Sequence, residues 1–394
     1  MLISEGDVGE YAHSGYAIGG GLLFIEAAPP LKGGARSFFS ADLGATWAPT
    51  TGACAAPQAC GSLAGAGIPQ RGGGVRGLGG VAPSNPFANA TSFSAPAAFE
   101  VAPAPGGGGV RCSCVNASVS FARLPRPASC GAKVAFGCPF RVTGGGFTAL
   151  PGGALLYTPI VRWASGGASP ATSVAAFTAA RGGGAWAFAG EVGGVTDFPL
   201  SQEGPNENAV SLASDGTVVA VVRLDCGDGP STHPFVNYTT ARSSDGGARW
   251  ALEGAIPNAG CARPRLLHLG ADGRGGVAPA PLLLSGGRQR DAAHAGWDAT
   301  LWLSPDGLGR SGGWLDPVSL TGAHNRLLRN ASWAFTPALN DSSAPRQCTS
   351  YTSLFELDGG PAPGANKRRL GVSYNRRLPP APDMFFFMPF TVEW

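Results

Sequence analysis

The sequence is poor in charge, in helical patterns and in long apolar runs, and each shortage excludes a class of protein. Its 394 residues include 28 Lys and Arg and 25 Asp and Glu, for a net charge of +3. Charged residues make up 13% of the chain, so we expect no dense basic face for nucleic acid. No run of about 18 apolar residues occurs, so we expect no helix that spans a membrane. Few segments keep a helical period for more than two turns, which favours an all-β fold.

Patterns for metal or nucleotide binding are missing as well. The nine Cys residues show no metal-ligand spacing, and the many Gly-x-Gly triplets follow from a content of 62 Gly residues. We therefore expect neither a metal nor a cofactor.

What the sequence does contain is a repeated template, Ser-x-Asp-x-Gly-x-x-Trp. It occurs without mismatch at Ser40–Trp47 and Ser243–Trp250, and in looser form before Trp186 and Trp314. Trp186, Trp250 and Trp314 follow one another at intervals of 64 residues, and the interval from Trp47 to Trp186 has room for two such units. A regular interval of this length indicates a repeated structural unit.

The template is typical of a turn between two strands. A short Asp side chain accepts hydrogen bonds from the backbone N–H groups that follow it, Gly adopts a positive φ, and Trp covers the turn. Short strands with Gly-rich turns at a long regular period predict a β-propeller, here of about six blades. We expect one domain over 1–394, in which the loop-rich stretch 51–139 contains the second blade.

The template resembles the Asp-box repeat of the sialidase (neuraminidase) family, whose fold is a six-bladed propeller. Three further segments are similar to that family, mainly between 205 and 394. "ENAVSLASDGTVVAVVRLD" resembles the strands that carry a Glu and an Arg, here Glu207 and Arg223. "TSYTSLFELDGG" resembles the segment of the catalytic Tyr, here Tyr351. "RRLGVSYNRR" with "MFFFMPFTVEW" resembles the closing strands, in which the chain end completes the first blade.

This resemblance implies a retaining glycosidase that releases terminal sialic acids. The carboxylate on the anomeric carbon of sialic acid would repel a carboxylate nucleophile, and sialidases use Tyr instead. A phenol needs a neighbouring base, so the resemblance assigns catalysis to Tyr351 and Glu207. Guanidinium groups hold a carboxylate with paired charged hydrogen bonds, which assigns substrate binding to Arg223 and to Arg288 or Arg290, with Arg290 preferred.

Two positions lack the residue that the family pattern requires. The family begins with Tyr-Arg-Ile-Pro, and the matching segment "YAHSGYAIGGG" has Ala12 at the Arg position. A general-acid Asp is expected in "APPLKGGARSFFS", where Gly33 stands instead. Loss of a general acid removes a factor of about 100 to 10,000 in rate. An inserted loop could let Arg36 or Asp7 compensate.

Two functions therefore stay open. The first is a sialidase-like exo-glycosidase that hydrolyses acidic-sugar substrates. The alternative is a degenerate propeller that binds glycans or proteins without turnover, which Asn375 favours because the family has Glu at that position. Arg141, in a segment similar to a first unit, is a weaker alternative for the missing Arg.

The compartment is inferred from Asn and Cys. Five of the twelve Asn residues begin an Asn-x-Ser/Thr triplet, which favours the secretory pathway and an extracellular or lysosome-like location. The Cys residues agree, since six of them lie in one loop-rich stretch and Cys226 with Cys261 could join neighbouring blades. The six are Cys54, Cys60, Cys112, Cys114, Cys130 and Cys138. "MLISEGDVGEYAHSG" shows no signal peptide, from which we expect a truncated start.

Overall fold

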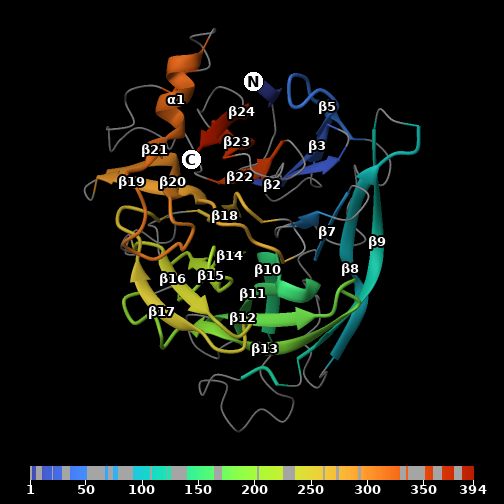
Figure 1. Cartoon of the computed structure of the whole chain (residues 1–394), viewed down its shortest axis with the longest axis vertical. Coiled ribbons are helices and arrows are strands. Elements are labelled where there is room, and N and C mark those ends of the chain that lie inside the picture. The colour runs from blue at the N-terminus through green and yellow to red at the C-terminus, as the bar shows by residue number, and fades with distance from the viewer. Residues whose placement is uncertain are drawn as a thin grey trace.

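The strands are arranged around a central axis as a β-propeller (Figure 1). The structure, a computed structural model, describes residues 2–5, 11–19, 21–28, 36–50, 67–69, 74–78, 92–106, 109–121, 123–125, 140–163, 171–201, 204–224, 236–260, 262–271, 275–291, 294–328, 334–335, 351–357, 366–376 and 384–394.

Three sheets are antiparallel meanders of four consecutive strands, and the first strand of each lies beside the axis (Figure 1). The first sheet consists of β2 (Tyr11–Gly19), β3 (Leu22–Ala28), β4 (Arg36–Ser40) and β5 (Ala48–Pro49). The second consists of β14 (Asn208–Leu212), β15 (Val218–Val222), β16 (Thr239–Ser243) and β17 (Ala251–Ala255). The third consists of β18 (Arg265–His268), β19 (Leu282–Asp291), β20 (His294–Ser304) and β21 (Val318–Ser319).

A fourth sheet joins the two ends of the chain. It contains β22 (Thr352–Glu356), β23 (Lys367–Arg376), β24 (Met384–Glu393) and β1 (Leu2–Glu5). β1 pairs antiparallel with β24, and Leu2 lies opposite Phe386. This arrangement corrects the expectation that the chain end completes the first blade. Instead, the N-terminal strand completes the sheet of the last three strands, because the outer edge of β24 is free to pair with it.

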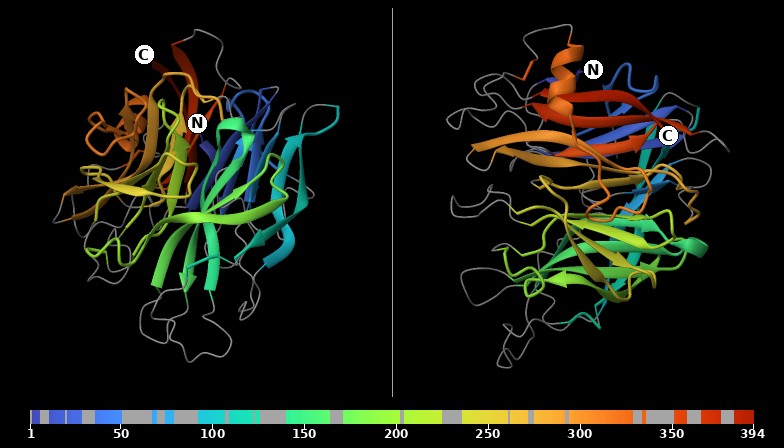
Figure 2. Two further views of the ribbon diagram at one scale, coloured as in Figure 1. Left: turned by 60° about the horizontal axis from the view of Figure 1, so that its bottom comes forward. Right: turned by 60° about the vertical axis from the view of Figure 1, so that its left-hand side comes forward.

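The remaining sheet has eight strands, so the prediction of six blades is not confirmed: the described strands form five sheets. One half contains β6 (Gly67–Pro69), β7 (Val75–Leu78), β8 (Ser92–Pro103) and β9 (Val110–Ser120). The other half contains β10 (Phe140–Ala149), β11 (Leu155–Trp163), β12 (Ala171–Ala179) and β13 (Ala185–Gly194). The halves merge because Ala185–Ala187 of β13 pair in parallel with Ser118–Ser120 of β9. The long hairpin of β8 and β9 runs along one side of the molecule (Figure 2).

The core lies between neighbouring sheets. In β15 all five residues of the run "VVAVV" are buried, whereas β17 at the outer edge has no buried residue. Side chains alternate between the two faces of a strand. Val218 and Val222 therefore pack toward β10–β13, while Val221 packs toward β18–β21. Apolar residues on both faces of the inner strands thus join each sheet to its neighbours.

The Ser-Asp-Trp template forms the turn between the third and fourth strands, as its composition predicts. In the turn from β16 to β17, Ser243 Oγ donates to Asp245 Oδ1 at 2.9 Å and accepts from the N–H of Gly247 at 2.8 Å. The Trp250 ring N–H donates to the carbonyl of Gly247 at 2.9 Å. Gly247 has a φ of 99°, which favours glycine. The turn from β4 to β5 at Ser40–Trp47 has the same contacts.

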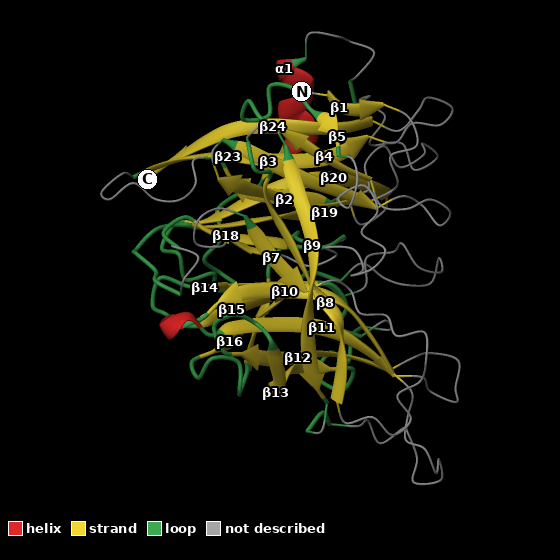
Figure 3. Ribbon diagram, turned by 90° about the vertical axis from the view of Figure 1, so that its right-hand side faces the viewer, coloured by secondary structure: helices red, strands yellow, loops and turns green. Residues whose placement is uncertain are grey.

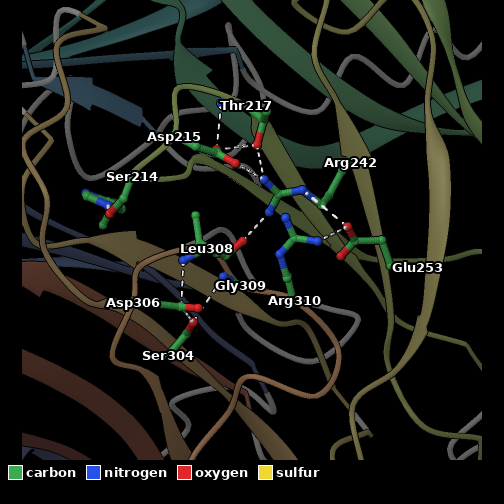
Figure 4. A network of polar contacts seen from close by, with 11 residues as sticks. Ser214, Asp215, Thr217, Arg242, Glu253, Ser304, Asp306, Leu308, Gly309 and Arg310 are labelled. Carbon is green, nitrogen blue, oxygen red and sulfur yellow. Dashed lines mark hydrogen bonds and ion pairs between the residues drawn. The ribbon is translucent and has the colours of Figure 1, made fainter.

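A polar network joins the sheets β14–β17 and β18–β21 (Figure 4). Arg242 on β16 pairs with Asp215 at 2.7 Å and with Glu253 at 3.3 Å, both in its own sheet. The same guanidinium donates to the carbonyl of Leu308, in the loop that follows β20. Arg242 is 9% exposed, whereas its partners Asp215 and Glu253 are 37% and 22% exposed, so this contact joins the edges of the two sheets at the border between core and solvent.

The helix α1 (Leu320–Leu327) lies at one end of the molecule (Figure 3). Its N-terminus is capped by Ser319, whose side chain accepts a hydrogen bond from Gly322 N–H at 2.9 Å. Within the described part of the chain, no helix has the length and apolarity to cross a membrane.

Candidate active site

Residues that are far apart in the sequence meet at the ends of the axial strands. Glu207 directly precedes β14, and Tyr351 directly precedes β22. Arg223 directly follows β15, which pairs antiparallel with β14, so Arg223 lies beside Glu207. The Arg223 N–H donates to the Glu207 carbonyl at 2.8 Å. Strand pairing within one sheet and the packing of two sheets around the axis thus bring these three residues together.

Their side chains form a closed set of contacts. The hydroxyl of Tyr351 donates to Glu207 Oε2 at 3.0 Å. Arg223 Nη1 donates to the same carboxylate oxygen at 2.7 Å and to the Tyr351 hydroxyl at 3.0 Å. Arg223 is 4% and Tyr351 is 8% exposed. A buried phenol therefore touches both a carboxylate and a guanidinium, which are the groups that can take its proton and stabilise the resulting phenolate.

Two further arginines lie at this site and were missed by the sequence analysis. Arg263 Nε is 3.8 Å from Glu207 Oε1, and Arg265 is the first residue of β18. Both are buried, at 5% and 7% exposure. The signal was the segment "ARPRLLHL", in which two Arg side chains directly precede an apolar strand. The family pattern pointed to the next strand, β19, instead.

The charges in the site shift its pKa values in opposite directions. Burial raises the pKa of Glu207, but the charges of Arg223 and Arg263 and its hydrogen bonds outweigh burial and leave that pKa below its ordinary value. Burial and the charge of Glu207 raise the pKa of Tyr351 well above its ordinary value. Burial and the neighbouring charge of Arg263 lower the pKa of Arg265 to about 9. In the resting site Glu207 is therefore ionised and Tyr351 is a neutral phenol.

A small axial cavity of ≈ 50 Å³ lies near this site. It is lined by residues of five axial strands, among them Gly15 and Tyr16 of β2, Asn208 of β14, Arg265 of β18 and Ser353 of β22. This volume is well below the roughly 300–1,000 Å³ of a typical ligand pocket. Asn208 directly follows Glu207, and Ser353 lies two residues after Tyr351, so the cavity is near the three-residue contact in the fold.

The other candidates are placed by the backbone alone. Arg288 and Arg290 lie on β19, and Arg288 is opposite Asp298 of β20. Ala12 lies on β2, opposite Ala27. The side chains of Arg288, Arg290 and Ala12 are outside the described part of the structure.

The alternatives for the missing residues stand as follows. Arg36 begins β4 and Arg141 lies on β10, but their side chains are not described. Gly33 and Asp7 lie outside the described residues. Asn375 lies on β23 and is 2% exposed, next to Tyr374, which pairs with Thr352.

Cysteines and metal ligands can be placed in part. Cys112 and Cys114 on β9 are disulfide-bonded, whereas Cys226 and Cys261 lie outside the described residues. In the described ranges, no group of three or more His, Cys, Asp and Glu side chains could hold a metal ion.

Comparisons with known proteins give similar folds at low identity. No protein-family model and no curated protein match the sequence. The sialidase of Trypanosoma rangeli, solved with 2,3-difluorosialic acid as a covalent intermediate, has a TM-score of 0.52 at 15% identity, with 96% of this chain and 54% of that chain covered. A Hadza microbial sialidase has a TM-score of 0.51 at 12% identity, with 97% and 66% covered. An ulvan lyase from a new family of polysaccharide lyases has a TM-score of 0.50 at 10% identity, with 100% and 95% covered.

This chain therefore spans about half the length of the trypanosomal sialidase. At these identities the likeness concerns the fold and not the substrate. The protein has the all-β propeller fold that sialidases and other carbohydrate-active enzymes share.

Proposed function

We propose that the protein is a sialidase-like exo-glycosidase that hydrolyses terminal α-linked sialic (nonulosonic) acids with retention of configuration. The observation that carries this proposal is the mutual contact of Tyr351, Glu207 and Arg223 beside an axial cavity. A Tyr nucleophile with a carboxylate base is the arrangement by which a glycosidase can attack an anomeric carbon that itself bears a carboxylate.

In the first step, the Tyr351 oxygen bonds to the anomeric carbon while its proton passes to Glu207. The bond from that carbon to the leaving oxygen breaks, and the leaving oxygen takes a proton from solvent or an acid. The raised pKa of Tyr351 requires proton transfer to accompany attack, because a free phenolate is not stable in the resting site. Arg223, 3.0 Å from the phenol oxygen, stabilises the negative charge that develops there.

In the second step, water attacks the anomeric carbon on the opposite face and the bond to Tyr351 breaks. Glu207 returns its proton to the Tyr351 oxygen, and the proton that water loses passes to solvent. Two inversions give net retention of configuration. This step regenerates the free enzyme, in which Tyr351 is neutral and Glu207 is ionised.

The preference for an acidic sugar rests on the arginines. Arg223 and Arg263 share one carboxylate, Glu207, and Arg265 lies two residues from Arg263. We propose that Arg288 or Arg290 adds to substrate binding. β19 pairs antiparallel with β18, and Ser285 lies opposite Arg265, the first residue of β18. Arg288 follows Ser285 by three residues, so its backbone lies beyond the N-terminal end of β18, which is the end at the site.

A general acid is not assigned among the described residues. We therefore expect faster turnover of substrates whose leaving group needs no proton, such as 4-methylumbelliferone, than of natural glycosides. The gap should be of the order of the factor of about 100 to 10,000 that a general acid supplies.

The test is release of 4-methylumbelliferone from its α-sialoside by the wild-type protein, Tyr351→Phe and Tyr157→Phe, across pH 4 to 8. Tyr157→Phe is the matched control, because the Tyr157 hydroxyl is buried and makes no hydrogen bond. We expect Tyr351→Phe to lose turnover by at least about 100-fold and Tyr157→Phe to keep it.

A second readout is trapping with 2,3-difluorosialic acid, followed by mass spectrometry of the peptide that contains Tyr351. A covalent adduct on Tyr351 supports the proposal. Equal turnover in the wild type and Tyr351→Phe contradicts it. Absence of turnover together with thermal stabilisation by sialic acid favours the alternative, a propeller that binds glycans or proteins.

We also propose that the protein folds in an oxidising compartment of the secretory pathway. The disulfide-bonded Cys112 and Cys114 support this proposal. Thiol labelling of the protein recovered from culture medium and from cytosol tests it, since reduced Cys112 and Cys114 in the active protein would contradict it.

A further inference from the structure

The backbone directly before Arg263 has an unusual conformation. Ala262 is 0% exposed and has a φ of 56°, in the left-handed region that residues other than glycine rarely adopt. Arg263 follows it, and its Nε lies 3.8 Å from Glu207 Oε1. A left-handed residue of this kind persists only where its surroundings hold it, and such residues cluster at functional sites. The direction in which Arg263 leaves the backbone therefore depends on whatever holds the turn at Ala262.

The side chain of Tyr238 holds this turn. Its hydroxyl donates to the carbonyl of Ala262 at 3.0 Å and accepts from the N–H of Gly287 on β19 at 3.1 Å. A Cβ atom on Gly286 would lie 2.5 Å from the same hydroxyl, so β19 approaches it there as bare backbone. One hydroxyl thus joins the left-handed turn before β18 to the neighbouring strand.

Tyr238 is itself fixed at both ends. It directly precedes β16, is 0% exposed, and belongs to one buried cluster with Leu284 and Trp302 of the neighbouring sheet. Its backbone N–H donates to the carbonyl of Ala259 at 2.6 Å, and its carbonyl accepts from the Ile256 N–H at 2.8 Å. The hydroxyl therefore has a defined position, from which it can define the position of the turn.

Glu207 meets charged or titratable groups from several other segments. Arg223, after β15, and Tyr351, before β22, contact its Oε2, whereas Arg263, before β18, faces Oε1. Glu207 and Arg265 also act on each other through their charges. At 3.8 Å Arg263 acts on the carboxylate through its charge, which favours the ionised form. A protonated Glu207 could not take the proton of Tyr351, so the position of Arg263 matters for the base.

We propose that Tyr238 is a positioning residue for the base Glu207. Its hydroxyl fixes the left-handed turn at Ala262, and the turn keeps Arg263 against the carboxylate. This inference rests on the proposed function, in which Glu207 takes the proton of Tyr351. The ionisation of Glu207 can nevertheless be measured without turnover, so the two proposals can fail separately.

The experiment follows the titration of Glu207 in the full chain, labelled with glutamate that carries ¹³C in its side-chain carboxyl group. The variant Glu207→Gln identifies the resonance of Glu207. Tyr238→Phe, Arg263→Met and the double variant are compared with the wild type. Tyr157→Phe is the matched control, because it also removes a buried phenol hydroxyl, but one that makes no hydrogen bond. Circular dichroism checks that each variant is folded.

We expect Arg263→Met and Tyr238→Phe each to raise the pKa of Glu207, because a neighbouring positive charge is removed or moved away. Tyr157→Phe should leave that pKa unchanged. Because Tyr238 acts through Arg263, the double variant should titrate like Arg263→Met alone. A folded Tyr238→Phe in which Glu207 titrates as in the wild type overturns the proposal, and so does a double variant in which the two effects add.

A second variant covers the case in which Tyr238→Phe does not fold. Ala262→Gly removes the preference against the left-handed conformation and makes the backbone freer, so the hydrogen bond from Tyr238 becomes the main restraint on the turn. We expect Glu207 to titrate in Ala262→Gly as in the wild type. A rise in its pKa equal to that in Arg263→Met would show that the bond does not hold the turn, and would overturn the proposal.

The pH dependence of kcat/KM for 4-methylumbelliferyl α-sialoside separates a positioning role from a merely structural one. The acid limb of this profile reports the ionisation of the base in the free enzyme. In Tyr238→Phe the limb should move to higher pH, with a loss of about 10-fold below it and little change above it. A loss that is equal at every pH contradicts the inference. A raised pKa of Glu207 in Tyr238→Phe without any turnover in the wild type keeps the inference and refutes the proposed function.

Discussion

Acid should loosen the contact between the sheets β14–β17 and β18–β21, because that contact contains a buried neutral histidine. His268, the last residue of β18, is 1% exposed. Its Nδ1 accepts from the Gly270 N–H at 3.1 Å, so the ring proton is on Nε2, which donates to Ser214 Oγ at 3.0 Å. Ser214 in turn donates to the carbonyl of Ala280 at 3.0 Å. No group in this chain of contacts offers an acceptor to a second ring proton.

The size of the effect follows from the pKa of His268. Burial lowers it from 6.5 to about 4 in the folded protein. Because the pKa of His268 is lower in the folded state, the unfolded state binds the proton more readily. The free energy of unfolding therefore falls as the pH falls from 6.5 toward 4. At about 1.4 kcal/mol per unit, the loss reaches up to about 3 kcal/mol at pH 4.

The assay is urea unfolding of the wild type and His268→Gln at several pH values between 7.5 and 4, followed by circular dichroism. The titration of carboxylates is common to both proteins and cancels in the difference. We expect the wild type to lose up to about 3 kcal/mol more than His268→Gln between pH 7 and pH 4. If the free energy of unfolding falls with pH by the same amount in the wild type and His268→Gln, the reasoning is refuted.

Two further predictions concern the turns and the seam between sheets. Gly247→Ala should lower the free energy of unfolding by about 2 kcal/mol, because φ is 99° and a Cβ atom would lie 2.7 Å from a leucine side chain. The control Gly312→Ala, with nothing within 4 Å, should change it by less than about 0.5 kcal/mol, and equal losses would contradict the turn argument. Arg242→Met should lower the free energy of unfolding by about 1 to 2 kcal/mol, because the carbonyl of Leu308 loses a charged donor while Asp215 and Glu253 are partly exposed and screened; Arg310→Met, at a side chain that is 59% exposed, should change it by less than about 0.5 kcal/mol. Chemical unfolding at pH 7 measures both, and a neutral Arg242→Met would mean that the network in Figure 4 adds no stability.

Much of the architecture follows from local chemistry that a sequence displays. The intervals between Trp186, Trp250 and Trp314 predict a repeated sheet, and each Trp does stand at or just before a fourth strand. The meeting of Glu207 and Tyr351 was also predictable, through segments similar to a known family. Glu207 and Tyr351 each precede a strand that pairs antiparallel with the next strand in the chain. The residues that fix their backbone positions are therefore close to them in the sequence.

Other features depend on contacts that no local pattern records. Arg263 and Arg265 look like surface arginines in a sequence, because their burial depends on strands more than a hundred residues away in the chain. The parallel pairing of β9 with β13 could not be predicted either, since no sequence pattern indicates that Val119 lies opposite Trp186. The charge balance of the site therefore had to come from the structure.

The pairing of β9 with β13 also bears on how the ring can deform. A run of three paired residues joins the two halves at this seam. The seam between β14–β17 and β18–β21 has single backbone hydrogen bonds, from Ser214 N–H to the Gly307 carbonyl and from Gly260 N–H to the Gly287 carbonyl, both at 3.0 Å, together with the side-chain contacts of Arg242 and His268. Backbone ladders resist shear along the strands, while side-chain contacts yield to salt and acid. The two halves of the sheet β6–β13 are therefore continuous in their backbone hydrogen bonding, whereas the sheets β14–β17 and β18–β21 remain separate sheets held together by isolated contacts.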